Sequence, residues 1–166
     1  MTYRAMPGFI FKRFAKRVGI KINREKFKTP AAAKAQLDEN LSKNNPVGLQ
    51  VGVYHLVYFP DEYRFHFNAH NLIVYGKENG RYLISDPIME EVTSLTELEL
   101  EKVRFAKGAF PPNGHMYYPT SFPKELDLKP AIIKGIKHTC RDMLAPIPIV
   151  GVKGIRMIAK LIRKWP

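Results

Sequence analysis

Apolar and polar positions near the start of the chain follow the spacing of two helices. Residues 8–19 place large apolar side chains near helical spacing with Lys and Arg between them, and Gly19 is a natural helix stop. Thr29 and Pro30 then supply an N-cap and a proline at the first helical position, ahead of the strong helix formers in residues 31–43. We therefore expect a basic amphipathic helix followed by a second, well-formed helix.

The middle of the chain has the pattern of strands and includes a hairpin. Residues 47–54 alternate with a period of two, as a half-buried strand does. Residues 55–68 carry aromatic side chains around a Pro-Asp turn and are interpreted as a strand end and loop. Residues 70–76 and 81–86 form the hairpin, and residues 78–80 fit a three-residue connection whose glycine takes the left-handed conformation.

Later segments return to helical patterns. Ser94 begins a Ser-x-x-Glu capping box, which predicts a short helix that ends at about Phe105. Residues 115–118 are expected to form a late strand. Residues 131–144 and 152–165 have helical patterns, and the prolines between them prevent one continuous helix. The predicted fold class is α+β, with an antiparallel sheet packed with helices and a C-terminal helical extension.

Length, composition and charge divide this picture into parts. The chain has 166 residues of ordinary globular composition, so we expect one main domain over residues 1–128 and a helical segment over residues 129–166. The net charge is +12, of which residues 1–28 carry +8 and residues 124–166 carry +7, whereas residues 29–123 carry −3. An acidic partner would therefore meet the two ends of the chain.

Cys140 is the single cysteine, which excludes an intramolecular disulfide framework and a multi-cysteine metal site. Because free cysteines are among the most buried residues, we expect Cys140 to be a buried structural residue of its helix. The first residues lack the pattern of a signal peptide, and the chain has no run of about 18 apolar residues. We therefore expect a cytoplasmic protein.

The predicted hairpin brings a histidine and an aspartate together. With a three-residue loop, His70 lies opposite Ile88, and Asp86 is its diagonal neighbour on the same face, about 7–8 Å away at the backbone. A two-residue loop would send Asp86 to the opposite face. A histidine held by a carboxylate suits a general base beside a thiol or hydroxyl. From the spacing alone, a histidine that merely satisfies a neighbouring acid fits as well.

Other kinds of site have little support. His66 and His70 would share one face of a helix, but in extended chain they lie about 13 Å apart, which is too far to chelate one metal ion. The Gly and Lys residues do not have the spacing of a phosphate-binding loop. We therefore expect neither a metal nor another cofactor.

Three stretches of the sequence resemble the butirosin biosynthesis protein H amino-terminal family: residues 45–51, 66–76 and 82–87. The histidine-containing strand followed by Asp-Pro is similar, more distantly, to the bacteriocin-processing cysteine peptidases. Residues 131–165 resemble the helical region that follows the domain in that family. The resemblance implies a papain-like fold of the cysteine peptidase and acyltransferase type.

The resemblance also implies a chemistry, namely a cysteine nucleophile, a histidine base and an aspartate that orients the base. Such a site moves an acyl group from an acyl carrier protein to an amine, or hydrolyses an amide. His70 matches the base and Asp86 the orienting residue, while His66 and Asn68 match the approach to the site, where substrate would bind. The family's cysteine lies on a helix near the start of the domain, so we expect the nucleophile in sequence upstream of this chain.

Other functions and partners remain open from the sequence. A relative without a nucleophile would bind an acyl carrier or a peptide without turning it over. A basic peripheral membrane or nucleic-acid-binding protein is a further alternative, with nucleic acid the weaker candidate. An acidic acyl carrier protein suits the charge of the chain, with a small-molecule amine or a peptide as substrate. Trp165 and five cations would allow the last helix to contact a membrane, and exposed apolar surface would favour a homodimer.

Overall fold

The computed structural model describes residues 9–165, and the contacts divide the chain into two units. The larger unit is residues 20–122. The smaller unit combines the first helix with residues 123–166, so contacts group the two ends of the chain together. The boundary that the sequence suggests, between residues 128 and 129, stays a prediction about the family domain.

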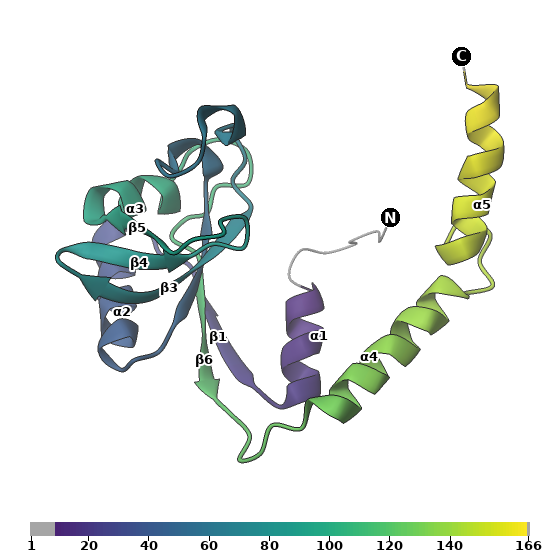
Figure 1. Ribbon diagram of the computed structural model, residues 1–166, viewed down its shortest axis with the longest axis horizontal. Coiled ribbons are helices and arrows are strands. Elements are labelled where there is room, and N and C mark those ends of the chain that lie inside the picture. The colour runs from purple at the N-terminus through teal and green to yellow at the C-terminus, as the bar shows by residue number, and fades with distance from the viewer. Residues whose placement is uncertain (1–8, 166) are drawn as a thin grey trace. The chain divides into compact units, whose positions relative to one another are not determined.

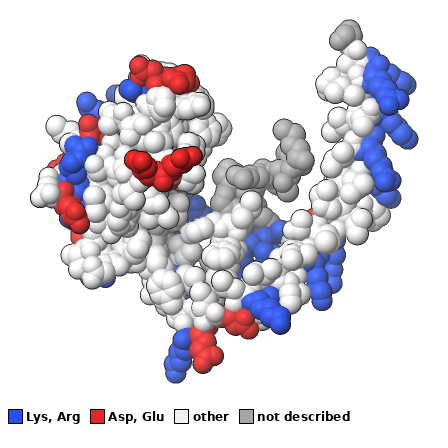
Figure 2. Space-filling model, in the orientation of Figure 1, with Lys and Arg blue, Asp and Glu red and all other residues white. Residues whose placement is uncertain are grey.

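The described residues of the smaller unit are helical (Figure 1) and contain three α-helices and a final 3₁₀ turn: α1 (Phe9–Val18), α4 (Leu128–Met143), α5 (Gly151–Leu161) and Ile162–Lys164. These positions confirm the helices expected at both ends of the chain. α1 contacts α4, and α4 contacts α5. Lys and Arg lie along one side of α5, as Figure 2 shows.

Cys140 lies on α4 and is exposed. The expectation of a buried cysteine was therefore wrong. Only Ala131 of α4 is buried among the described residues, because the helix has few neighbours in the smaller unit. Whether a cysteine on a helix is buried depends on which segments pack against that helix. Within the smaller unit, α1 and α5 pack against only a small part of α4.

Between residues 9 and 165, no helix combines the length and the apolar character needed to cross a membrane.

The larger unit is built on one antiparallel sheet of six strands in the order β1, β6, β2, β3, β4, β5 (Figure 1). The strands are β1 (Lys21–Glu25), β2 (Val47–Val51), β3 (His70–Glu78), β4 (Arg81–Ser85), β5 (Thr93–Thr96) and β6 (Met116–Ser121). Every pairing is antiparallel. With the helices described next, this sheet confirms the predicted α+β class.

Two helices cover one face of the sheet, α2 (Pro30–Ser42) and α3 (Glu97–Arg104). α2 contacts β2 and β3, and α3 contacts β2, β4 and β5. Between the helices and the sheet lies a core of aliphatic side chains, which includes Leu37, Leu49, Leu72, Val74, Ile84, Leu95, Leu100 and Val103. Alternate residues of β3 point into this core or out to solvent, as the period of a strand requires.

The helix starts follow from local capping. Thr29 accepts a hydrogen bond from the Ala32 amide at 3.3 Å, which confirms the predicted cap of α2. The capping box of α3 is formed by Thr96 and Glu99, so the box predicted at Ser94 was wrong. The reason is the sheet: Ser94 pairs with β4 as part of β5, and the chain is free to turn into a helix only after that strand ends.

The turn between β3 and β4 is shorter than expected. Glu78 pairs with Arg81, which leaves a connection of two residues, Asn79 and Gly80. Both have left-handed backbones, with φ of 49° and 75°. Two such residues are typical of a type I′ hairpin turn. The three-residue connection predicted from the sequence was therefore wrong.

A β-bulge in β3 corrects the register that this short turn would produce. The pairing shifts by one residue between Val74 and Gly76, which leaves Tyr75 as an extra residue on β3. Beyond the bulge, Ile73 pairs with Ser85. That is the pairing a three-residue loop without a bulge would give, so the two departures cancel and Asp86 stays on the face predicted for it.

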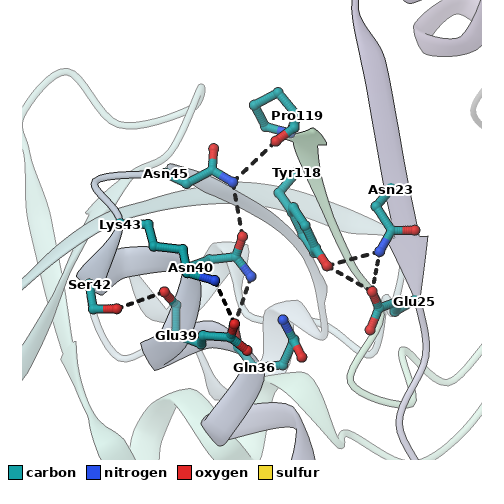
Figure 3. A network of polar contacts seen from close by, with 10 residues as sticks. All are labelled: Asn23, Glu25, Gln36, Glu39, Asn40, Ser42, Lys43, Asn45, Tyr118 and Pro119. Atoms are coloured by element: carbon teal, nitrogen blue, oxygen red, sulfur yellow. Dashed lines mark hydrogen bonds and ion pairs between the residues drawn. The ribbon is translucent and has the colours of Figure 1, made fainter. Parts of the chain in front are cut away.

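A polar network fixes the end of α2 against the sheet (Figure 3). Asn40 is buried and donates from Nδ2 to the Gln36 carbonyl at 2.8 Å. The side-chain amide of Asn45 donates to Asn40 Oδ1 at 2.9 Å and to the Pro119 carbonyl at 3.1 Å. Two asparagines thus connect α2 to the turn before β2 and to β6.

We predict that Asn40→Ala destabilises the larger unit by about 1 to 3 kcal/mol, because the half-buried Asn45 amide loses its acceptor on Asn40. Ser42→Ala is the matched control, since Ser42 also donates to a carbonyl of α2 but is exposed. It should change the free energy of unfolding by less than about 0.5 kcal/mol. Urea denaturation of the two variants measures both values, and equal effects would contradict a special role for Asn40.

Candidate active site

His70 and Asp86 meet at one end of the β3–β4 hairpin. His70 is the first residue of β3 and pairs with Val51, so its side chain points to the covered face of the sheet. Asp86 directly follows β4. His70 Nε2 lies 2.7 Å from Asp86 Oδ2, and the exposed fractions of the two side chains are 9% and 0%. The predicted pair is thus a buried, direct hydrogen bond.

Two further donors complete the surroundings of the Asp86 carboxylate. The Ile88 amide donates to Oδ1 at 3.0 Å, because the Asp-Pro step begins a turn that brings this amide back to the side chain. The Tyr58 hydroxyl donates to Oδ2 at 2.8 Å. The buried carboxylate therefore accepts three hydrogen bonds from three different segments of the chain.

These contacts set the ionisation of the site. Burial raises the pKa of Asp86, but the hydrogen bonds from His70, the Ile88 amide and Tyr58 outweigh it and hold the pKa below its ordinary value of 3.8. Burial, followed by the hydrogen bond and the charge of Asp86, raises the pKa of Tyr58. At neutral pH Asp86 is therefore a carboxylate, and Tyr58 is a neutral hydroxyl that donates to it.

The segment between β2 and β3 supplies residues that the sequence analysis missed. Tyr58 and Phe59 lie between two short 3₁₀ helices, Val53–His55 and Asp61–Tyr63. The Phe59 ring is buried and meets the His70 ring edge-on, with 5.5 Å between centroids. Phe59 thus limits how the imidazole can rotate, while Tyr58 holds the carboxylate. Aromatic residues in a loop are a weak signal for such roles.

His66 and Asn68, the two residues expected at the approach to the site, differ in their surroundings. His66 is exposed, and its ring stacks on Tyr54 with 4.1 Å between centroids. Asn68 is buried and donates from Nδ2 to the carbonyls of Lys107 and Ala109. Asn68 therefore holds the loop before β6 in place. A role of these two residues in substrate binding stays a prediction.

Another histidine of the larger unit, His115, forms its hydrogen bond through the other ring nitrogen, Nδ1. His115 Nδ1 lies 2.9 Å from Gln50 Oε1, and Gln50 uses its amide group to donate to the Asn68 carbonyl. Burial, followed by the charges of Arg24 and Lys26, lowers the pKa of His115 to about 4. His115 is therefore a neutral ring at physiological pH, and its protonated Nδ1 donates a hydrogen bond to Gln50 Oε1.

The site contains an imidazole and a carboxylate, but the larger unit has no cysteine, since Cys140 belongs to α4 of the smaller unit. Among residues 9–165, no group of three or more His, Cys, Asp or Glu side chains is placed to hold a metal ion. What the arrangement can do is accept a proton on the free ring nitrogen of His70 and stabilise the resulting imidazolium through Asp86.

Comparison with known proteins places the chain within a family. The model of the butirosin biosynthesis protein H N-terminal family matches residues 1–87, a stretch that includes His70 and Asp86. The chain belongs to this family. A domain of unknown function (DUF4872) matches residues 98–166, from α3 to the end of the chain. No curated protein matches the sequence.

One solved structure similar to the chain is described as a C39-like peptidase from Bacillus anthracis. The two are 13% identical, and the TM-score is 0.48. The match covers 66% of this chain and 56% of the peptidase chain, so this chain spans little more than half of that protein's length.

We predict that His70 and His115 are opposite tautomers. Asp86 accepts from His70 Nε2, whereas Gln50 accepts from His115 Nδ1. Nitrogen-15 chemical shifts of the two imidazole rings distinguish the tautomers, and His115 serves as the internal reference. The same tautomer for both rings would contradict the hydrogen bonding described here.

We also predict that Asp86 makes the protein sensitive to acid. Because its folded pKa is lowered, the stabilisation is complete above the ordinary value of 3.8 and is lost as pH falls below that value through the folded pKa. Asp86→Asn should therefore flatten the decline in the free energy of unfolding in this range. The control is Asp61→Asn, because the Asp61 side chain is 91% exposed. Equal slopes for both variants and the parent would contradict the prediction.

Proposed function

We propose that the larger unit provides the base and the orienting carboxylate of a cysteine-dependent acyltransferase or amide hydrolase. The observation that carries the proposal is the buried hydrogen bond of 2.7 Å between His70 Nε2 and Asp86 Oδ2. It fixes one ring nitrogen as the donor and leaves Nδ1 with a lone pair for the reacting group. Membership of the butirosin biosynthesis protein H N-terminal family, with the papain-like chemistry that the resemblance implies, supports the same function.

The proposed reaction has two acyl-transfer steps. His70 Nδ1 takes the proton of a cysteine thiol, and the thiolate attacks the carbonyl carbon of a thioester or amide. The bond to the leaving thiol or amine breaks as that group receives the proton from His70, which leaves an acyl-cysteine. An amine or water then gives a proton to His70, attacks the acyl group and releases the cysteine, which regains the proton.

In this scheme Asp86 and Tyr58 act through His70. The carboxylate stabilises the imidazolium that forms in each step and keeps the ring in one orientation. Tyr58 and the Ile88 amide hold the carboxylate ionised and in place by donating to it. Phe59 excludes other ring orientations through its edge-on contact.

The thiol would come from a polypeptide segment outside residues 1–166, as the position of the family's cysteine implies. An acyl carrier protein is the proposed acyl donor and a small-molecule amine or a peptide the acceptor. Carrier proteins of this kind are acidic, and the charge of +7 on residues 124–166 would accelerate their encounter with the chain. A reducing cytoplasm would keep the nucleophilic thiol available.

The test uses the protein at its full natural length. After incubation with an acyl thioester, intact mass spectrometry should show one added acyl group. His70→Ala should abolish the adduct, and Asp86→Asn should slow its formation by up to about 10⁴-fold. Tyr58→Phe should slow it roughly tenfold, since a hydrogen bond to a charged group contributes about 1.5 kcal/mol. His55→Ala, which changes an exposed histidine, is the control and should have no effect.

Acylation that persists in His70→Ala would show that His70 is not the base and would overturn the proposal. A protein that binds acyl carrier tightly but never becomes acylated would instead be a binding relative without turnover.

A further inference from the structure

The C-terminal helix α5 and the turn after it have exposed cations on one side and exposed apolar side chains on the other. From residue 151 to residue 165 the sequence has five cations and no acidic residue. The cations are Lys153, Arg156, Lys160, Arg163 and Lys164, all exposed. The exposed large apolar side chains are Ile155, Ile158, Leu161, Ile162 and Trp165. Figure 2 shows the cations along one side of α5 and other residues along the opposite side.

Within the smaller unit, the apolar side of α5 has little cover. Ile158 is 55% exposed and Trp165 is 67% exposed. Ile147 and Ile149, in the segment that leads into α5, are exposed as well. Monomeric soluble proteins rarely expose continuous apolar surface of this kind unless it meets a partner.

We propose that α5 and the turn after it bind the surface of an anionic lipid membrane. A helix of this type lies in the plane of the interface, with its apolar side in the acyl-chain boundary and its cations beside the phosphate groups. Lys and Arg reach the phosphates while their aliphatic stems stay in the apolar layer. Trp165 ends the helix with an aromatic ring of the kind that prefers the headgroup level.

Charge and apolar contact together argue against a second copy of the chain and against a nucleic acid as the partner of α5. A second copy of α5 would bring five more cations and no acid, so the flanks of a paired helix would have no opposite charges to contact. A nucleic acid would neutralise the cations but leave the apolar side in water. An anionic membrane satisfies both sides of the helix with one surface.

Trp165 is the single tryptophan of the chain, so its fluorescence reports on the end of α5 alone. The full chain is titrated with vesicles of phosphatidylcholine, with and without phosphatidylserine. We expect the emission of Trp165 to shift to the blue with the anionic vesicles and to be quenched when their acyl chains are brominated. High salt should reverse the shift, because it screens the attraction between the cations and the lipid.

Two pairs of variants separate the contributions of charge and apolar contact. Lys153→Gln, Lys160→Gln and Lys164→Gln together should lower the partition coefficient on the order of 100-fold, at roughly fivefold for each cation. The matched control changes three exposed lysines of the larger unit to Gln, namely Lys26, Lys28 and Lys107, and should leave binding unchanged.

The second pair of variants tests the apolar contact. Ile158→Asp with Ile162→Asp should abolish the blue shift, because carboxylates would then face the acyl-chain boundary. Leu98→Asp, at a position on α3 that is 72% exposed, is the control and should bind as the parent does.

An emission that does not respond to anionic vesicles would overturn the proposal, as would equal binding to neutral and anionic lipid. A blue shift that appears without lipid as the protein is concentrated, together with a doubled mass in solution, would assign the surface to a second copy and also overturn it.

Discussion

The larger unit depends on keeping the carboxylate of Asp86 ionised where water does not reach it. A buried charge is tolerated only when hydrogen bonds replace its lost hydration. Asp86 receives these bonds from His70 on β3, from Tyr58 in the segment before β3, and from the Ile88 amide after β4. The carboxylate therefore fixes the mutual positions of three segments, and the same contacts that make it tolerable in the interior fix its orientation toward the His70 ring.

The sequence could predict the parts of this arrangement whose causes are local. Thr29 and Pro30 specify the start of α2, and the alternation of apolar residues from Val47 specifies the strand β2. The contact between His70 and Asp86 was predicted as well, although the predicted turn length differed from the one in the structure. The two-residue turn of Asn79 and Gly80 and the bulge at Tyr75 together give the register that a three-residue turn alone would give.

The remaining features depend on contacts between distant residues. Tyr58 reaches Asp86 across 28 positions of sequence, from a segment without a regular pattern, so its role has no local signal. Two overlapping capping boxes were available near α3, and the pairing of Ser94 with β4 excluded the first of them. The exposure of Cys140 depends on what covers α4, which the composition of that helix does not determine. β1 lacks a clear alternation, and its place at the edge of the sheet comes from its pairing with β6.

The bulge at Tyr75 also bears on how this hairpin can change in evolution. His70 and Asp86 are 16 positions apart in the sequence. Their contact depends on this total separation, and the same separation can be reached with a turn of a different length. Deleting the bulged residue alone would turn every side chain beyond it to the other face, and so would adding one residue to the turn alone. Made together, the two changes leave the contact intact. Insertions and deletions within the hairpin should therefore be inherited as compensating pairs, and relatives that differ at the turn would differ at the bulge in the opposite sense.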